Sequence, residues 1–248
     1  IKLKTLKKIF KKNKVFFFNY NHNSFFEGFY RFCAILISPL FLKLNPNFIS
    51  FMSLVCGLLG LLIFVFYSLN LKLILIFFVL SFILDFTDGL VARTQKKSSF
   101  YGRFIDGLFD IFVFGFLHLV FLIYLVKNSY FSEDNFFYIF YLITIFLLPI
   151  QHLILDRFSS LARWCNEINK KKLIKPYYRN NYFNKITMLF VDLQHLTVFF
   201  ILISKNFDLI FILNLFFIIS FLSSLFSIML YFNLSKNKLK FTSNQKDN

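Results

Sequence analysis

Apolar stretches of about 20 residues recur along this 248-residue chain, and they constrain its fold more than any other feature. A helix needs about 20 predominantly apolar residues to cross the hydrocarbon core of a bilayer. Because lipid cannot satisfy exposed backbone N–H and C=O groups, each such stretch must be helical. The predicted spans are 46–69, 71–93, 100–126, 134–157, 183–203 and 207–233. The sequence therefore predicts an all-α integral membrane protein with six transmembrane helices.

A further hydrophobic segment, 25–44, precedes the first predicted span. It carries four residues that are unusual inside a span: Glu27, Arg31, Pro39 and Lys43. An amphipathic helix lying in the membrane interface accommodates such residues better than a spanning helix does. We predict a basic amino-terminal segment (1–24), a membrane domain (25–233) that begins with the interfacial helix, and a polar tail (234–248).

The basic residues are distributed unevenly between the two sides of this predicted topology. With the amino terminus inside, the external connections contain only Lys72, Lys127 and Lys205 of the 28 Lys and Arg residues. Enrichment of basic residues in cytoplasmic loops is the usual pattern of membrane proteins. The net charge of +16 is thus explained by topology and by an anionic lipid bilayer, and we expect no nucleic acid as a partner. No cleavable signal peptide is recognisable, and we expect a prokaryotic inner (cytoplasmic) membrane.

Four of the twelve acidic residues lie inside predicted spans. Asp85 and Asp88 are three residues apart near the end of one span, and Asp106 and Asp110 are four apart near the start of the next. Each pair therefore shares a helix face. The short connection 94–99 makes the two helices antiparallel neighbours, so all four carboxylates are expected to converge below the cytoplasmic surface.

Four carboxylates so close together require compensating positive charge. Oxygen ligands favour hard divalent cations, so we predict Mg²⁺ or Mn²⁺, with two ions fitting four ligands better than one. The alternative is a pair of interhelical ion pairs with Arg93 and Arg103. Small residues at 89, 92 and 102 either leave room for a ligand beside the backbone or allow close helix packing.

The pattern Asp85-x2-Asp88-Gly89-x2-Ala92-Arg93-x8-Gly102-x3-Asp106-x3-Asp110 resembles the motif of the CDP-alcohol phosphotransferase family, with all eight positions and gaps in place. Segment 44–60 is similar to the usual entry to that family's first span. The resemblance implies a phospholipid-biosynthesis enzyme that transfers a phosphatidyl or related phospho-alcohol group. The donor would be a CDP-linked lipid such as CDP-diacylglycerol, the acceptor a small alcohol, and the released product CMP.

The resemblance also implies roles for individual residues. Asp85, Asp88 and Asp106 would be metal ligands, and Asp110 would lie between metal and acceptor as general base as well as ligand. Four further residues would line the CDP pocket: Gly89, Ala92, Arg93 and Gly102. Relatives form homodimers, so a homodimer is expected.

The acceptor stays open among serine, glycerol 3-phosphate, inositol phosphate, choline and a second lipid. Arg157, Arg163 and Lys185 either hold an acceptor phosphate or serve as positive-inside anchors. Asp192 and His195 share a helix face and either recognise a polar acceptor or pair with each other. Two other classes compete with the enzyme: a divalent-cation transporter, since intramembrane carboxylates mark ion paths, and a non-catalytic membrane scaffold.

Overall fold

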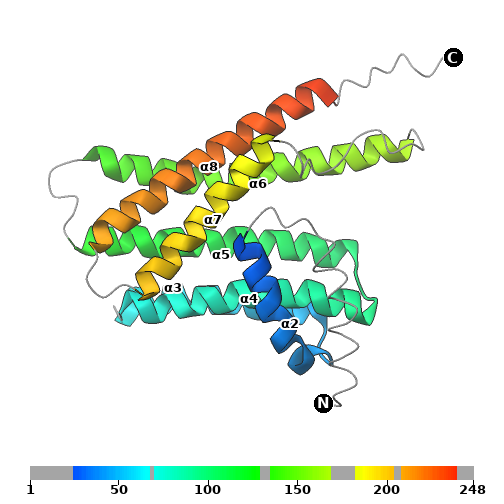
Figure 1. Cartoon of the computed structure of the whole chain (residues 1–248), viewed down its shortest axis with the longest axis horizontal. Coiled ribbons are helices and arrows are strands. Elements are labelled where there is room, and N and C mark those ends of the chain that lie inside the picture. The colour runs from blue at the N-terminus through cyan, green and yellow to red at the C-terminus, as the bar shows by residue number, and fades with distance from the viewer. Residues whose placement is uncertain (1–24, 68–69, 129–134, 169–181, 204–207, 239–248) are drawn as a thin grey trace.

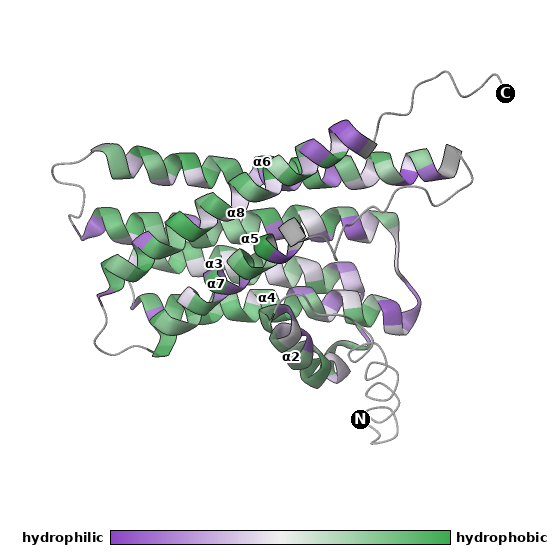
Figure 2. Ribbon diagram, turned by 45° about the horizontal axis from the view of Figure 1, so that its top comes forward, coloured by the Kyte–Doolittle hydropathy of each residue, from purple (hydrophilic) through white to green (hydrophobic). Residues whose placement is uncertain are grey.

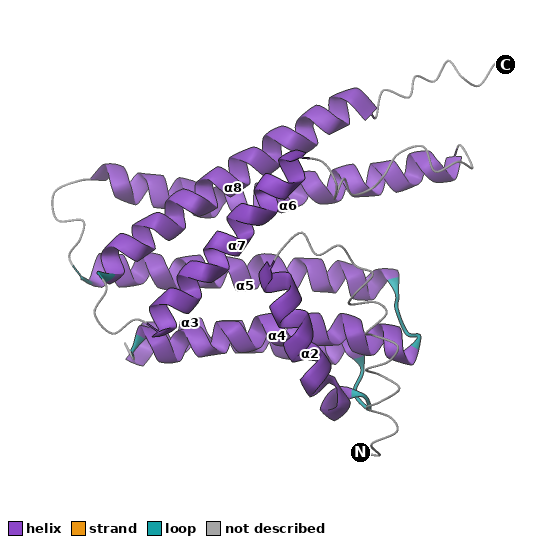
Figure 3. Cartoon of the chain, viewed as in Figure 1, coloured by secondary structure: helices purple, strands orange, loops and turns teal. Residues whose placement is uncertain are grey.

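A computed structural model describes residues 25–67, 70–128, 135–168, 182–203 and 208–238, and the regular secondary structure in these ranges is entirely helical (Figure 3). The predicted segment 1–24 lies outside the described residues. The helices are α2 (Phe25–Phe41), α3 (Pro46–Tyr67), α4 (Leu71–Gln95), α5 (Phe100–Lys127), α6 (Asn135–Ile168), α7 (Tyr182–Ile203) and α8 (Leu209–Lys238).

The long helices form a bundle in which α3, α4 and α5 run side by side, while α7 and α8 pack together across it (Figure 1). Helix α2 is 17 residues long over its described part, at the lower limit for a span, and it crosses α4 steeply. Within the described residues, five helices are long and apolar enough to cross a membrane, and α7 contributes a shorter apolar stretch, Met188–Ile203. Large apolar side chains such as Phe66, Phe146 and Phe211 are exposed, as lipid-facing positions should be. The predicted all-α membrane fold is confirmed.

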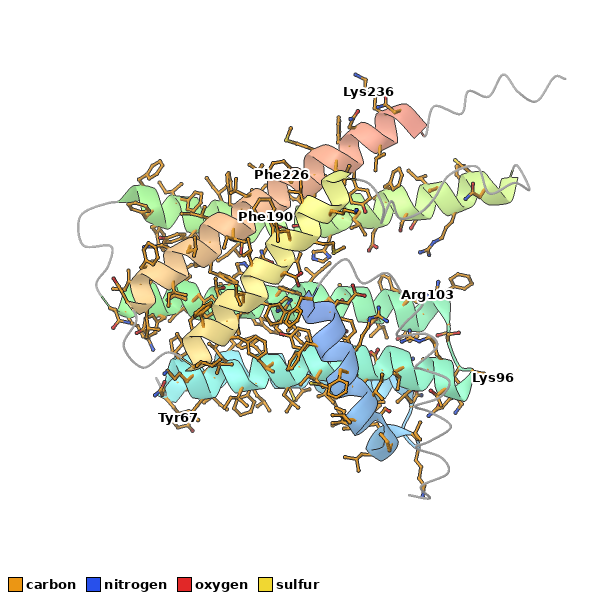
Figure 4. The ribbon with its side chains drawn as sticks, in the orientation of Figure 1. Tyr67, Lys96, Arg103, Phe190, Phe226 and Lys236 are labelled. Atoms are coloured by element: carbon orange, nitrogen blue, oxygen red, sulfur yellow. The ribbon has the colours of Figure 1, made fainter. Side chains whose placement is uncertain are left out.

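The two ends of the bundle differ in polarity. Hydrophilic residues gather at the end where α4 passes into α5, and the opposite end is mostly hydrophobic (Figure 2). Lys96, Arg103 and Lys236 lie toward this polar end, whereas Tyr67 lies at the other (Figure 4). We call it the basic end. It is where the predicted topology placed the cytoplasmic loops.

The turn between α4 and α5 is fixed by local hydrogen bonds. Lys96 ends α4 in the left-handed conformation with φ 57°, and the N–H of Lys97 donates to the carbonyl of Ala92 at 2.9 Å. Ser99 caps α5, because its hydroxyl accepts from the N–H of Gly102 at 2.9 Å. A four-residue turn with both ends capped holds the two helices in one register.

Helices α3 and α4 pack closely through small residues. The buried Ser53 and Ser81 exchange hydrogen bonds, each hydroxyl donating to the other residue's carbonyl at 2.9 and 2.8 Å. A Cβ on Gly60 would lie 3.1 Å from the ring of Phe78, which is tighter than most Cβ contacts, so the two helices approach closely there. This packing sets the position of α3 beside the acidic residues of α4.

Two helices continue past the predicted ends of their spans. Helix α6 reaches Ile168 rather than 157, and α8 reaches Lys238 rather than 233. The extension of α6 is amphipathic: Phe158 and Ala162 are buried against Tyr231 of α8. Hydropathy alone ends a span at the last apolar residue, but packing between α6 and α8 carries both helices beyond it.

Gly60→Val is expected to destabilise the protein, because the added methyl groups would overlap Phe78. Overpacking of this kind costs about 1–3 kcal/mol, which should lower the thermal unfolding midpoint in detergent by several degrees. The control is Gly115→Val, since a Cβ at Gly115 meets nothing within 4 Å. Equal midpoints for the two variants would contradict the close α3–α4 contact.

Candidate functional site

Two consecutive helices bring four carboxylates together near the basic end. Oxygen atoms of Asp85, Asp88 and Asp106 all lie within 4.8 Å of one another. The carboxyl of Asp110 lies within hydrogen-bonding distance of that of Asp85. The predicted convergence is therefore confirmed, and its cause is the helical spacing on either side of a short capped turn. We call these four residues the aspartate cluster.

The aspartate cluster has the chemistry of a divalent-cation site. Oδ1 of Asp106 is buried and accepts no hydrogen bond from any described residue. Carboxylates at this separation repel unless a proton or a cation lies between them. One adjacent guanidinium, that of Arg93, cannot neutralise four such groups. The residues present therefore fit a hard cation such as Mg²⁺ or Mn²⁺, which takes oxygen ligands.

Helix α3 supports the cluster from the side. The hydroxyl of the buried Ser50 donates a short hydrogen bond to Oδ2 of Asp88. Asn47 lies one turn earlier on α3, and its side chain approaches Gly102 of α5. Sequence reasoning missed Ser50 and Asn47. The available signal was weak: Asn47, Ser50 and Ser53 recur every three residues at the start of a mostly apolar helix.

A cavity of about 250 Å³ opens beside the cluster at the basic end, and we call it the basic cavity. It is lined by Asp88 and Asp106 and by three cationic residues: Arg93, Lys97 and Arg103. The four residues predicted to line a nucleotide pocket all lie here: Gly89, Ala92, Arg93 and Gly102. A cationic wall facing a cation-binding carboxylate pair suits a ligand with several phosphate oxygens.

The two motif glycines keep this cavity open. A Cβ on Gly102 would lie 3.1 Å from Oδ1 of Asn47 and from Oγ of Ser99, both of which line the cavity. A Cβ on Gly89 would lie 3.3 Å from a guanidinium nitrogen of Arg93. Gly60 differs, because its missing side chain makes room for the Phe78 ring of a neighbouring helix. The motif glycines thus border ligand-sized space, and helix packing is served by other glycines.

A second cavity, of about 190 Å³, lies on the other side of the aspartate cluster, and we call it the aromatic cavity. Its polar lining comes from Asp85, Asp110, Glu27 and His195. The rest is aromatic or apolar: Tyr30, Phe82, Phe86, Phe114, Met188 and Val191. Asp85 and Asp110 line this cavity alone, whereas Asp88 and Asp106 line the basic cavity alone. The cluster therefore separates two differently charged spaces.

Helix α2 covers the aromatic cavity and is held there by α7. The carboxylate of Asp192 accepts hydrogen bonds from the N–H groups of Phe25 and Phe26, at 2.8 and 2.9 Å, and so caps the first turn of α2. Nδ1 of His195 is 3.1 Å from the hydroxyl of Tyr30. Asp192 and His195 thus anchor α2, a role that neither alternative in the sequence analysis anticipated. His195 also faces the cavity.

The other residues considered for acceptor binding lie apart from both cavities. Arg157, Arg163 and Lys185 line neither of the two, and Arg157 and Lys185 are exposed. This placement favours the anchoring role over phosphate binding.

Comparison with known proteins identifies the family. The sequence profile of the CDP-alcohol phosphatidyltransferase family matches residues 43–219, and the chain belongs to this family. Searches of curated proteins and of solved structures returned no match. Membership implies transfer of a phosphatidyl group from a CDP-alcohol to an acceptor, and the family generally uses divalent metals.

Asp88→Asn and Asp106→Asn are each expected to weaken Mn²⁺ binding at least tenfold. Mutation of residues that only hydrogen-bond to metal ligands already costs about 10- to 100-fold in metal affinity. Asp88→Asn and Asp106→Asn each remove a charged ligand oxygen itself, so their effect should be at least as large. Titration of free Mn²⁺ by electron paramagnetic resonance on the purified protein measures the affinity without an activity assay. The control is Asp208→Asn, since Asp208 caps α8 through the N–H of Ile210 and lies outside the cluster. Unchanged affinity in the cluster variants would contradict the assigned site.

Proposed function

We propose that the protein transfers the phosphatidyl group of a CDP-linked lipid such as CDP-diacylglycerol to a small alcohol and releases CMP. The observation that carries the proposal is the division of the aspartate cluster between two cavities. One cavity is cationic and suits the CDP part of the donor, and the other holds the remaining two carboxylates. A reaction that joins two substrates at one phosphorus needs this kind of arrangement.

In this proposal the cluster holds two Mg²⁺ or Mn²⁺ ions, with Asp85, Asp88 and Asp106 as ligands and Asp110 as a further ligand and general base. When bound, the ions supply positive charge that stabilises the pyrophosphate and the departing CMP. Ser50 keeps the Asp88 carboxylate oriented. Arg93 adds positive charge beside the nucleotide phosphates, and Gly89, Ala92 and Gly102 leave space for the nucleotide.

The acceptor hydroxyl oxygen forms a bond to the phosphorus that carries the lipid alcohol. The bond from this phosphorus to the bridging oxygen breaks, and its electron pair leaves with CMP. Asp110 accepts the hydroxyl proton. An ordinary carboxylate is a weak base toward an alcohol, so the proton transfer must accompany the attack rather than precede it.

The depth of the cluster favours this enzyme over a cation transporter. Asp88 lies seven residues before the end of α4, and Asp106 lies six residues after the start of α5. At 1.5 Å per residue these two are about 10 Å inside helices about 40 Å long, and Asp85 and Asp110 are about 15 Å inside. Transport sites usually lie near the bilayer midplane. A site near one interface instead lets the acyl chains of a lipid donor stay in the membrane while its head group meets a soluble acceptor.

The proposal places the basic end in the cytoplasm of a prokaryotic cell, since basic loops remain on that side. It also includes a homodimer, as the family resemblance implies.

Asp110→Asn should reduce the kcat for CMP release from CDP-diacylglycerol by about 100- to 10,000-fold, the usual contribution of a general base. The assay needs Mn²⁺ and a panel of acceptor alcohols that includes serine, choline and glycerol 3-phosphate, and chelation with EDTA should abolish release from the wild type. The control is Asp156→Asn, because Asp156 is exposed on α6 and lines neither cavity. Full activity in folded Asp110→Asn protein would refute the base assignment.

Gly102→Ala should raise the KM for CDP-diacylglycerol, since the new methyl group enters the basic cavity 3.1 Å from Asn47. Gly107→Ala adds the same methyl group on the same helix where nothing lies within 4 Å, and it should leave the KM unchanged. Steady-state kinetics on both variants make the comparison. Equal KM values would mean that the nucleotide does not occupy the basic cavity.

A further inference from the structure

We infer that the aromatic cavity is the acceptor subsite and that it takes an alcohol carrying a cationic ammonium group and no phosphate or carboxylate. This inference rests on the proposed function, because it names the second substrate of the same site.

The direction of attack places the acceptor on the side of the aromatic cavity. In an in-line displacement the attacking and leaving oxygens lie on opposite sides of the phosphorus. With CMP leaving through the basic cavity, the hydroxyl must approach from the opposite side of the aspartate cluster. The aromatic cavity lies there, and Asp110, the proposed base, lines it.

The charge of the lining also bears on the acceptor. Of the ten described residues that line the aromatic cavity, three are acidic (Glu27, Asp85 and Asp110) and none is Lys or Arg. The guanidinium of Arg31 lies close by, 2.6 Å from the carboxylate of Glu27, and this pair has no net charge. Asp85 and Asp110 would hold the metal ions, so neither they nor Glu27 leaves a net charge in the metal-loaded cavity. A phosphorylated alcohol would therefore find no Lys or Arg in the described lining to bind its phosphate, whereas an ammonium group needs none.

The aromatic lining of the cavity suits an ammonium group. Rings of Tyr30, Phe82, Phe86 and Phe114 border the cavity, and adjacent rings lie close together: the Tyr30 and Phe82 centroids are 5.7 Å apart and the Phe82 and Phe114 centroids 5.1 Å. Aromatic rings attract cations through their quadrupoles, and aromatic enclosures recognise quaternary ammonium groups. Phe86 already makes such a contact, since the guanidinium carbon of Arg31 lies 5.5 Å from its ring centroid.

Helix α2 supplies both Glu27 and Tyr30 to the cavity, and it is anchored by α7. The hydrogen bonds that Asp192 accepts from the start of α2, and the one between His195 and Tyr30, link residues more than 160 positions apart. These hydrogen bonds hold the Glu27 carboxylate and the Tyr30 ring beside the cavity.

The first test measures turnover and binding together on the Mn²⁺-loaded wild type. CMP release from CDP-diacylglycerol is followed with choline, ethanolamine, serine, inositol, glycerol 3-phosphate and inositol 1-phosphate, and radiolabelled choline binding is measured in parallel. The expected result is that choline or ethanolamine supports release, that choline binds, and that the anionic alcohols do neither.

The outcomes separate the inference from the proposed function. Release with only serine, inositol or a phosphorylated alcohol overturns the inference and supports the transferase. Choline binding that ethanolamine displaces, without release from any acceptor, supports the subsite and contradicts the transferase. Absence of both binding and release contradicts both.

The second test uses two phenylalanines on α5. Phe114→Leu should raise the KM for the ammonium alcohol on the order of tenfold, with kcat and the KM for CDP-diacylglycerol changed by less than about twofold. Phe112→Leu is the matched control, since Phe112 is exposed and does not line the cavity. Glu27→Gln should also raise the KM for the ammonium alcohol. Because the Glu27 side chain is 23% exposed, this variant provides the test if Phe114→Leu fails to fold. A change confined to the KM for CDP-diacylglycerol would mean that the cavity holds the lipid part of the donor, and it would overturn the inference.

Discussion

The burial of four carboxylates inside two membrane helices is the constraint on which the rest of the structure depends. Acidic side chains in a span cost several kcal/mol unless a cation compensates them. Their repulsion must also be resisted by the backbone, and the capped turn between α4 and α5 does this by holding the helices in register. The pair of serines that joins α3 to α4, and Ser50 beside Asp88, stiffen the same region. The four carboxylates are thus held close together in an arrangement that suits a cation even when none is bound.

The aspartate cluster also separates the basic cavity from the aromatic cavity. Because its residues alternate between two faces, Asp88 and Asp106 border a cationic space while Asp85 and Asp110 border an acidic, aromatic one. The two substrates of a group transfer can then reach one phosphorus from opposite sides without sharing a binding surface. Helix α2 makes this separation possible, since without it the aromatic cavity would lose one wall.

The sequence predicts the cluster well for a physical reason. Spacings of three and four on either side of a short connection define both the shared face and the depth of each carboxylate, so Asp85, Asp88, Asp106 and Asp110 could be placed without a structure. Ser50 could not be placed in this way, because its role depends on how α3 is rotated against α4. The aromatic cavity was also beyond reach, since it joins Glu27 of α2 to His195 of α7, and no local pattern encodes how distant helices cross. Helices α6 and α8 continue beyond the predicted spans for a related reason, because packing between these helices extends them past their apolar runs.

The most direct test of the central claim is an experimental structure of the protein with Mn²⁺ and CDP. The account predicts manganese within about 2.0–2.5 Å of oxygens of Asp85, Asp88 and Asp106, the usual range for hard cations and carboxylates. It also predicts the nucleotide in the basic cavity, with the aromatic cavity left free for the acceptor. Manganese elsewhere, or a nucleotide seated among Tyr30, Phe86 and Phe114, would contradict the account.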